Sequence, residues 1–180
     1  VSVIYISKQG VWYWLEQPSQ IIEKDPQQLL IENAMQRLHL TPHATAGPWV
    51  LAAKPEQGIA VDCVFPIVHG THGEDGTLQG LLEMLGLPYV GCNTLSSAIC
   101  MEKHIAKSLL QQAGLKTAPW FAFTQQQRAD YSYDMIQKTL GNTVFAKPAS
   151  AGSSIGITRV TSASQYEAAL DTAFRYHSKV

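Results

Sequence analysis

The sequence predicts an α/β protein with a parallel sheet in its N-terminal part and a smaller α+β unit after it. Residues 61–70, "VDCVFPIVHG", are a short apolar run that ends in glycine, which is typical of a buried parallel strand. A helical pattern and the short segment "LPYVG" follow, and this strand–helix–strand order indicates a βαβ unit. Farther along, two strand-like segments flank a glycine-serine loop, which predicts the second unit.

Each N-terminal element is predicted from its local pattern. Residues 1–17 are rich in β-branched and aromatic side chains around a glycine turn, and they predict two strands. Residues 18–58 have several prolines and mixed polarity, and they predict loops with at most one short helix. Between Leu78 and Leu85 four leucines recur at i, i+3, i+4 and i+7, and Gly86 is placed to end that helix.

The second unit is predicted from helix and strand patterns that follow one another along the chain. A helix is expected from about Ser97 to Ala113. A strand at 118–124 and a helix within 130–141 come next. The segments "NTVFAKP" and "SIGITRV" predict two strands that enclose the glycine-serine loop.

The last helix is predicted within residues 162–177. Ser164 and Glu167 form a capping-box pattern at its start. We place the domain boundary near Asn93, so that residues 1–93 form the N-terminal domain and residues 94–180 the second. The apolar stripes expected to be buried on the two helices of the second domain are Ala98, Met101, Ile105 and Leu109, and Tyr166, Ala169, Leu170, Ala173 and Phe174.

Composition argues against several classes of partner. The 180 residues carry a formal net charge of −1, which gives no electrostatic reason to expect nucleic acid or an anionic membrane as partner. No apolar run approaches the roughly 18 residues of a membrane span. The cysteines and histidines show no metal-type spacing, so no metal site is predicted in this segment. Cys63 is expected to be a small buried hydrophobe, and a reducing cytoplasm fits the unpaired thiols best.

The glycine-serine loop is the first candidate site. In "FAKPASAGSSIGIT", residues 145–158, Lys147 follows a strand and precedes a run of small residues. Backbone N–H groups converge on a phosphate at little steric cost where side chains are small. Ser153 and Ser154 add hydroxyl donors, and Lys147 supplies a cation. The alternative is an ordinary hairpin turn with an edge-strand lysine that blocks unwanted pairing.

A second candidate site is "HGTHGEDGTLQG", residues 69–80. It leaves the end of an apolar run and enters a helix, where open α/β sheets bind ligands. His69 could donate to an anion, and Glu74 could cap the helix or orient a cationic group. The alternative is plain turn chemistry, in which glycines make the bends and Asp75 is the cap.

Taken together, these motifs resemble those of the D-alanine–D-alanine ligases of the ATP-grasp superfamily. The chain has the family's H-G-x-x-G-E-D-G-x-L-Q-G run, its G-L-P-Y-x-G segment and its M-[DE]-K helix. "FAKPASAGSSIGITRV" matches the family's V-K-P-x-x-x-G-S-S-x-G-x-x-x-V. The four motifs occur in order over residues 60–180, whereas residues 1–58 match more loosely. The resemblance implies an ATP-grasp fold for the smaller α+β unit.

The resemblance also implies a reaction. ATP phosphorylates the carboxylate of one D-alanine, and the amine of a second D-alanine attacks the acyl phosphate to give a dipeptide for peptidoglycan synthesis. Mg²⁺ neutralises the phosphates. Such phosphoryl transfer needs positioning and charge neutralisation more than covalent chemistry. Two alternatives stay open: a D-alanine–D-lactate ligase, and a non-catalytic fragment that binds a nucleotide.

The resemblance assigns site residues in three groups. On pattern alone Lys103 is a solvated helix lysine, as is Lys107 one turn on, and only the resemblance changes this for Lys103. The residues expected to hold ATP are Lys103, Lys147, Gly152, Ser153 and Ser154. The residues expected to take part in catalysis are Ser153, near the first D-alanine, and His69. The residues expected on the substrate side are His69 and Glu74.

Family members are considerably longer than this chain. The resemblance implies a first strand before Val1. It also implies a C-terminal domain after Val180, with the adenine-binding segment and the acidic Mg²⁺ ligands. The segment alone is therefore expected to be inactive and to be part of a longer enzyme. The resemblance further implies a cytoplasmic homodimer, formed largely through the N-terminal domain, that acts on D-alanine and ATP.

Overall fold

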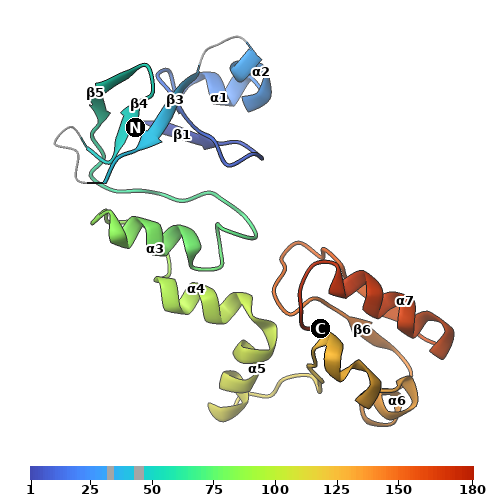
Figure 1. Ribbon diagram of the computed structural model, residues 1–180. Helices are drawn as coiled ribbons and strands as arrows, with labels where there is room; N and C mark the ends of the chain where they lie inside the picture. Colours follow the sequence, from blue (N-terminus) through green and yellow to red (C-terminus); the bar gives the residue numbers. More distant parts are fainter. Residues whose placement is uncertain (32–34, 43–46) are drawn as a thin grey trace. The chain divides into compact units, whose positions relative to one another are not determined.

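The computed structural model describes residues 1–31, 35–42 and 47–180, and it divides into two compact units (Figure 1). The first unit comprises Val1–Val64 with Met84–Pro88, and the second comprises Phe65–Glu83 with Tyr89–Val180. Within the described residues, every helix is too short or too polar to cross a membrane. The boundary at Asn93 stays a prediction.

The first unit is built on a five-stranded antiparallel sheet in which each strand pairs with the next one along the chain. The predicted hairpin near the N-terminus is confirmed, with Tyr5 opposite Tyr13. Leu15 and Leu29 are fully buried in its core, and the Trp12 and Trp49 rings stack at 5.9 Å. The elements are β1 (Val3–Ile6), β2 (Trp12–Leu15), α1 (Gln20–Glu23), α2 (Pro26–Ile31), β3 (Met35–Leu40), β4 (Trp49–Leu51) and β5 (Lys54–Ile59).

The prediction of loops over residues 18–58 is wrong. This stretch contains α1, α2 and strands β3 to β5. β3 buries only every third residue, and β5 exposes its first four residues, so neither strand shows the alternation that marks a strand in a sequence. Pairing with neighbouring strands, rather than local pattern, makes these residues extended.

The mixed α/β class is confirmed, but the predicted parallel pairing is wrong: all strand pairs among the described residues are antiparallel. Residues 61–70 and 87–91 form no named strand, although the Val64 N–H donates to the Pro88 carbonyl at 2.8 Å. A parallel strand needs bonded neighbours and covered faces. Here the side chains of Phe65 and Ile67 are 69% and 72% exposed, and Cys63 is exposed rather than buried.

Helices open the second unit. α3 (Thr77–Met84) forms as predicted, but the helix expected over 97–113 is two helices, α4 (Thr94–Met101) and α5 (Lys103–Gln112). They separate at Glu102, whose backbone is extended at φ −81° and ψ 92°. The predicted buried stripe is also wrong, because α5 buries none of its residues fully.

The rest of the second unit is a two-stranded antiparallel sheet packed against helices. β6 (Val144–Ala146) and β7 (Thr158–Val160) pair as predicted, and the helix expected within 130–141 is confirmed. The other elements are η1 (Gln125–Asp130), α6 (Tyr133–Leu140) and α7 (Ala163–Phe174). The core they share consists of Phe123, Tyr133, Ile136, Val144, Ala146, Val160, Tyr166, Ala169 and Leu170.

Two local predictions in this unit need correction. Residues 118–124 form no named strand, although Phe123 exchanges two backbone hydrogen bonds of 3.0 Å with Val180. The capping box is also wrong, because Ser162 is the N-cap of α7 and Ser164 lies inside the helix. Glu167 accepts from the Arg128 Nε–H at 2.9 Å instead. A charged partner outside the helix outcompetes the local cap.

Buried Tyr166 makes stability depend on pH above pH 10. Its side chain is 4% exposed, its hydroxyl donates to the Tyr131 carbonyl at 2.8 Å, and burial raises the pKa of Tyr166 to about 12. Because the folded pKa lies above the unfolded value of 10.0, this stability is complete below pH 10. It is lost as the pH rises to about 12, by about 3 kcal/mol. Urea unfolding of wild type and Tyr166→Phe between pH 10 and about 12 measures this effect. The same change of unfolding free energy with pH in both proteins would contradict it.

Candidate functional site

Three lysine ammonium groups line one cavity of about 540 Å³ in the second unit. Lys103 and Lys107 come from α5, and Lys147 follows β6 directly. No carboxylate lines this cavity among the described residues. Its apolar lining includes Trp120, Phe121, Phe123, Ile136, Leu140, Val144 and Leu170. Cations beside an apolar wall suit a ligand with an anionic end and a flat apolar end.

The break between α4 and α5 positions Lys103. Glu102 forms an isolated antiparallel bridge with Ser150, and the Lys103 N–H donates to the Ala149 carbonyl at 3.0 Å. The Lys103 ammonium donates to the Ala151 carbonyl at 2.6 Å. The start of α5 is thereby fastened to the start of the glycine-serine loop. Burial, and then the charge of Lys147, lower the pKa of Lys103.

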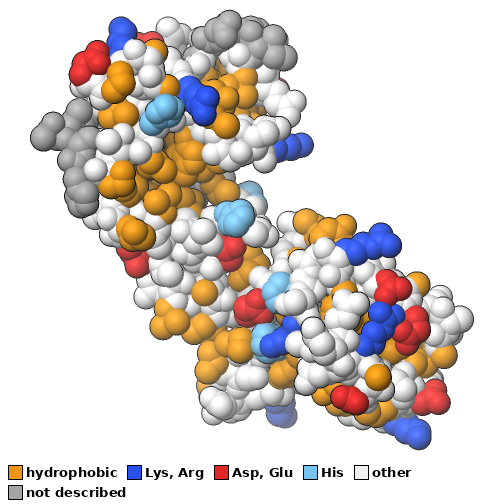
Figure 2. All heavy atoms as spheres, in the orientation of Figure 1, with side chains coloured by type: hydrophobic (Ala, Val, Ile, Leu, Met, Phe, Trp, Pro, Cys, Tyr) orange, Lys and Arg blue, Asp and Glu red, His pale blue; other side chains and the backbone are white. Residues whose placement is uncertain are grey.

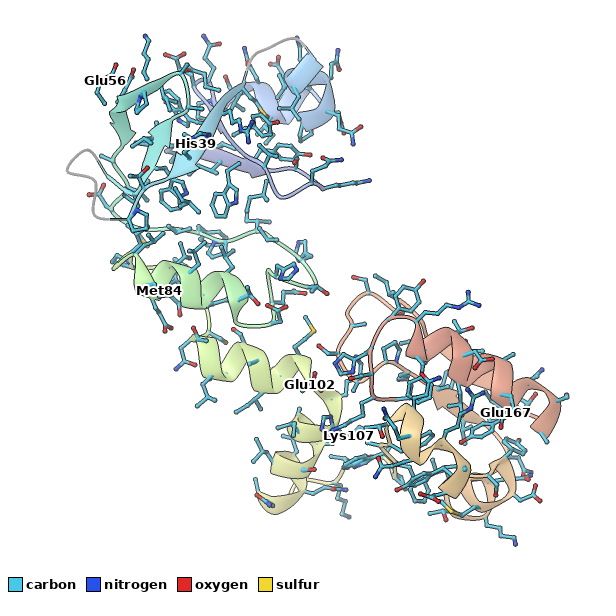
Figure 3. All side chains as sticks on the ribbon, in the orientation of Figure 1. His39, Glu56, Met84, Glu102, Lys107 and Glu167 are labelled. Atoms are coloured by element: carbon cyan, nitrogen blue, oxygen red, sulfur yellow. The ribbon has the colours of Figure 1, made fainter. Side chains whose placement is uncertain are left out.

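Lys147 and Lys107 complete the cationic wall. The Lys147 side chain is exposed, and its ammonium lies 5.6 Å from the centroid of the Phe145 ring. Lys107, labelled in Figure 3, donates only weakly, to the Ala118 carbonyl at 3.5 Å. Burial, and then Lys147, lower the pKa of Lys107. Lys107 is half-buried and lines the cavity, and its i,i+4 spacing from Lys103 places both lysines on one face of α5.

The glycine-serine loop has two residues in the left-handed region, Ser153 at φ 51° and Ser154 at φ 60°. Each such residue other than glycine costs roughly 1–2 kcal/mol. Both serines are exposed, and within residues 47–180 neither their amides nor their hydroxyls donate to a protein group. Strain at an exposed loop with free donors is typical of a binding segment.

The loop that carries His69 and Glu74 is folded around the Glu74 carboxylate. Glu74 accepts from the Gly70 N–H at 2.6 Å and lies 3.6 Å from His69 Nδ1. The Gly70 hydrogen bond lowers the pKa of Glu74. A Cβ atom on Gly152 would lie 3.8 Å from Glu74 Oε2, so the glycine-serine loop approaches this carboxylate closely. The two candidate loops meet.

Asp75 supplies the turn chemistry at the start of α3. Its carboxylate accepts from the His72 N–H at 2.8 Å and from the Thr77 N–H at 3.0 Å. The alternative reading of this loop is therefore correct for Asp75. Glu74 does not take part in this turn: its half-exposed carboxylate contacts Gly70 and His69 instead.

A second cavity of about 460 Å³ lies beside this loop. His69 and Glu74 line it, together with Gln79, whose amide donates to the Gly73 carbonyl at 2.9 Å. The Gln79 side-chain oxygen is buried without a partner in the described residues. The presence of Gln79 in this cavity was not predicted, although the residue lies in the H-G-x-x-G-E-D-G-x-L-Q-G run.

The structure places the predicted site residues in different locations. Lys103 and Lys147 line the first cavity, and His69 and Glu74 line the second. Ser153 and Ser154 line neither cavity, and Gly152 is near Glu74 rather than the lysines. The roles of these residues stay predictions.

A cluster of polar side chains lies next to Lys103, at the junction of α4 and α5. Glu102 lies 3.3 Å from both His104 and His177. His104 lies 3.0 Å from the Lys179 ammonium, and burial, followed by the Lys179 charge, lowers the pKa of His104. Acidic, basic and histidine side chains also gather near this junction in the space-filling view (Figure 2).

Comparison with known proteins finds similar sequences and structures among D-alanine–D-alanine ligases. D-alanine–D-alanine ligase A of Chromobacterium violaceum is 42% identical over 181 residues, which cover 100% of this chain and 50% of the relative. The ligase structure from Coxiella burnetii has a TM-score of 0.90 at 36% identity, over 99% of this chain and 51% of that one. The Bacillus anthracis ligase complexed with ATP has a TM-score of 0.57 at 38% identity, over 66% and 39%.

A glycine-serine loop between antiparallel strands, beside a lysine-lined cavity, places this chain in the ATP-grasp fold class. The model of the D-ala D-ala ligase N-terminus matches residues 1–92, and that of the C-terminus matches residues 109–180. The chain belongs to the D-alanine–D-alanine ligase family. It spans about half the length of the relatives it matches.

Proposed function

We propose that the complete protein that contains this chain joins two D-alanine molecules in an ATP-dependent reaction, for peptidoglycan synthesis. The observation that carries the proposal is the approach of two loops: Gly152 of the glycine-serine loop lies beside Glu74 of the substrate-side loop. This approach would place a phosphate and an amino acid side by side. Family membership supports the same reaction.

The lysine-lined cavity would bind ATP. When bound, ATP supplies the phosphoryl group that activates the carboxylate of the first D-alanine. Lys103 and Lys147 would hold its phosphates by charge-assisted hydrogen bonds. The free amides and hydroxyls of Ser153 and Ser154 would donate to the same oxygens. The apolar wall would cover the flat base and exclude water.

On the substrate side, Glu74 would orient the ammonium group of the first D-alanine. The lowered pKa of Glu74 keeps its carboxylate ionised at neutral pH. His69, which is 79% exposed, would donate to the substrate carboxylate, and Ser153 would position the same group for phosphorylation.

The described residues do not fit Mg²⁺ on their own. No group of three histidine, cysteine or acidic side chains suited to a metal occurs among them, and no carboxylate lines the lysine cavity. Magnesium prefers carboxylate oxygens and phosphates. Its protein ligands would lie outside these residues.

Ligation of D-alanine to D-lactate is the alternative reaction within the same class of enzyme. A non-catalytic nucleotide-binding role is the alternative, and it predicts ATP binding without phosphate release. We also propose a cytoplasmic homodimer formed largely through the first unit, as the family resemblance implies.

The test uses the complete protein with Mg-ATP and D-alanine. We expect phosphate release that depends on D-alanine. We expect Lys147→Ala to weaken ATP binding by roughly 10- to 150-fold, which corresponds to about 1.5–3 kcal/mol for a charged hydrogen bond. Lys138→Ala, which removes an exposed lysine of α6, is the control. Wild-type protein without D-alanine-dependent phosphate release would contradict the proposed reaction, and unchanged ATP affinity in Lys147→Ala would contradict its site.

A further inference from the structure

We infer that Lys107 is a third cationic ligand of the nucleotide phosphates, beside Lys103 and Lys147. This inference rests on the proposed function, because it takes the ligand of the lysine-lined cavity to be a nucleotide. The family resemblance assigns only two lysines to the phosphates. The third emerges from the geometry of α5.

The position of Lys107 follows from the helix. Lys103 and Lys107 are one turn apart on α5, and residues at i and i+4 project from the same face. Both line the same cavity, which Lys147 enters from the end of β6.

The charges around the cavity are unbalanced. Three ammonium groups line it and no carboxylate does, among the residues that the structure describes. The nearby acid Glu102 is already flanked by His104 and His177, each at 3.3 Å. Burial first, and then the charge of Lys147, lower the pKa values of Lys103 and Lys107, so part of the lowering is repulsion between the lysines. A polyanion in the cavity would relieve this repulsion.

Lys107 also has the donors that such a ligand needs. The Lys103 ammonium is engaged by the Ala151 carbonyl at 2.6 Å, which reduces what it can offer. Lys107 makes one long contact, 3.5 Å to the Ala118 carbonyl, so two of its three N–H donors are available within the described structure. The competing explanation is that Lys107 only fastens the segment after α5 through Ala118.

The experiment measures the affinity of the complete protein for ATP and for adenosine by calorimetry. Lys107→Gln is expected to weaken ATP binding roughly 10-fold and to leave adenosine binding unchanged, because adenosine has no phosphate. Lys107→Arg should retain most of the ATP affinity. Lys116→Gln removes an exposed lysine that does not line the cavity, and it should bind ATP as wild type does.

Two results would overturn the inference. One is unchanged ATP affinity in Lys107→Gln, and the other is an equal loss for ATP and adenosine, which would indicate a structural role through Ala118. Both leave the proposed function standing, since wild type still binds ATP. Wild-type protein that fails to bind ATP would overturn the proposed function and this inference together.

Discussion

Replacing Lys103 by alanine is expected to lower kcat/KM for ATP by roughly 100- to 1,000-fold. The substitution removes a cation from the cavity and also releases the glycine-serine loop, because the Lys103 ammonium donates to the Ala151 carbonyl at 2.6 Å. A loss of this size corresponds to about 3–4 kcal/mol, the lower part of the roughly 3–6 kcal/mol expected for two charged hydrogen bonds. Steady-state kinetics of the complete protein with varied ATP measure it.

Lys103→Arg is the matched variant for this prediction. It keeps the charge but replaces a compact ammonium by a planar group that does not fit the same carbonyl, so we expect partial recovery at most. Thermal unfolding of both variants shows whether the fold is intact. Activity within threefold of wild type in Lys103→Ala would refute the assignment.

Replacing Gly76 by alanine is expected to destabilise the protein by about 3 kcal/mol, from roughly 1–2 kcal/mol for a left-handed residue and a similar cost for overpacking. Gly76 has φ +91°, and a Cβ atom there would lie 2.6 Å from the Thr94 carbonyl oxygen. Thr94 is the first residue of α4, so the clash would separate α3 from α4. Urea unfolding measures the change.

Gly86→Ala is the control, because Gly86 also has positive φ, at +67°, but nothing lies within 4 Å of the added Cβ atom. It should cost only about 1 kcal/mol, the backbone contribution alone. Equal destabilisation by both substitutions would show that the contact between Gly76 and Thr94 contributes nothing.

Elements with a strong local pattern were predictable from the sequence. The N-terminal hairpin, α3, α6 and the β6–β7 pair all form where alternation, leucine spacing or turn residues indicate them. β3 and β5 were not predictable, because their polar residues become extended only by pairing with neighbours. The prediction of a strand at 61–70 is wrong for the opposite reason, because there the local pattern is strong but the fold does not follow it. The apolar pattern of this run is that of a buried strand, but Phe65 and Ile67 are exposed.

In the site, too, features of local sequence were predictable and contacts between distant segments were not. The small residues of the glycine-serine loop and the spacing of His69 and Glu74 are visible in the sequence. The approach of Gly152 to Glu74 is not, because it joins segments about 80 positions apart that only the fold brings together. The place of Lys107 in the cavity was not predicted, because it depends on the break at Glu102 where α5 begins.

The central claim is that these residues belong to an enzyme that uses ATP to join two D-alanine molecules. The most direct test counts the D-alanyl-D-alanine molecules formed for each ATP consumed by the complete protein, with product identified by mass spectrometry. We expect one dipeptide, one ADP and one phosphate per turnover, and no ATP consumption without D-alanine. Consumption of ATP without dipeptide, or consumption that is indifferent to D-alanine, would contradict it.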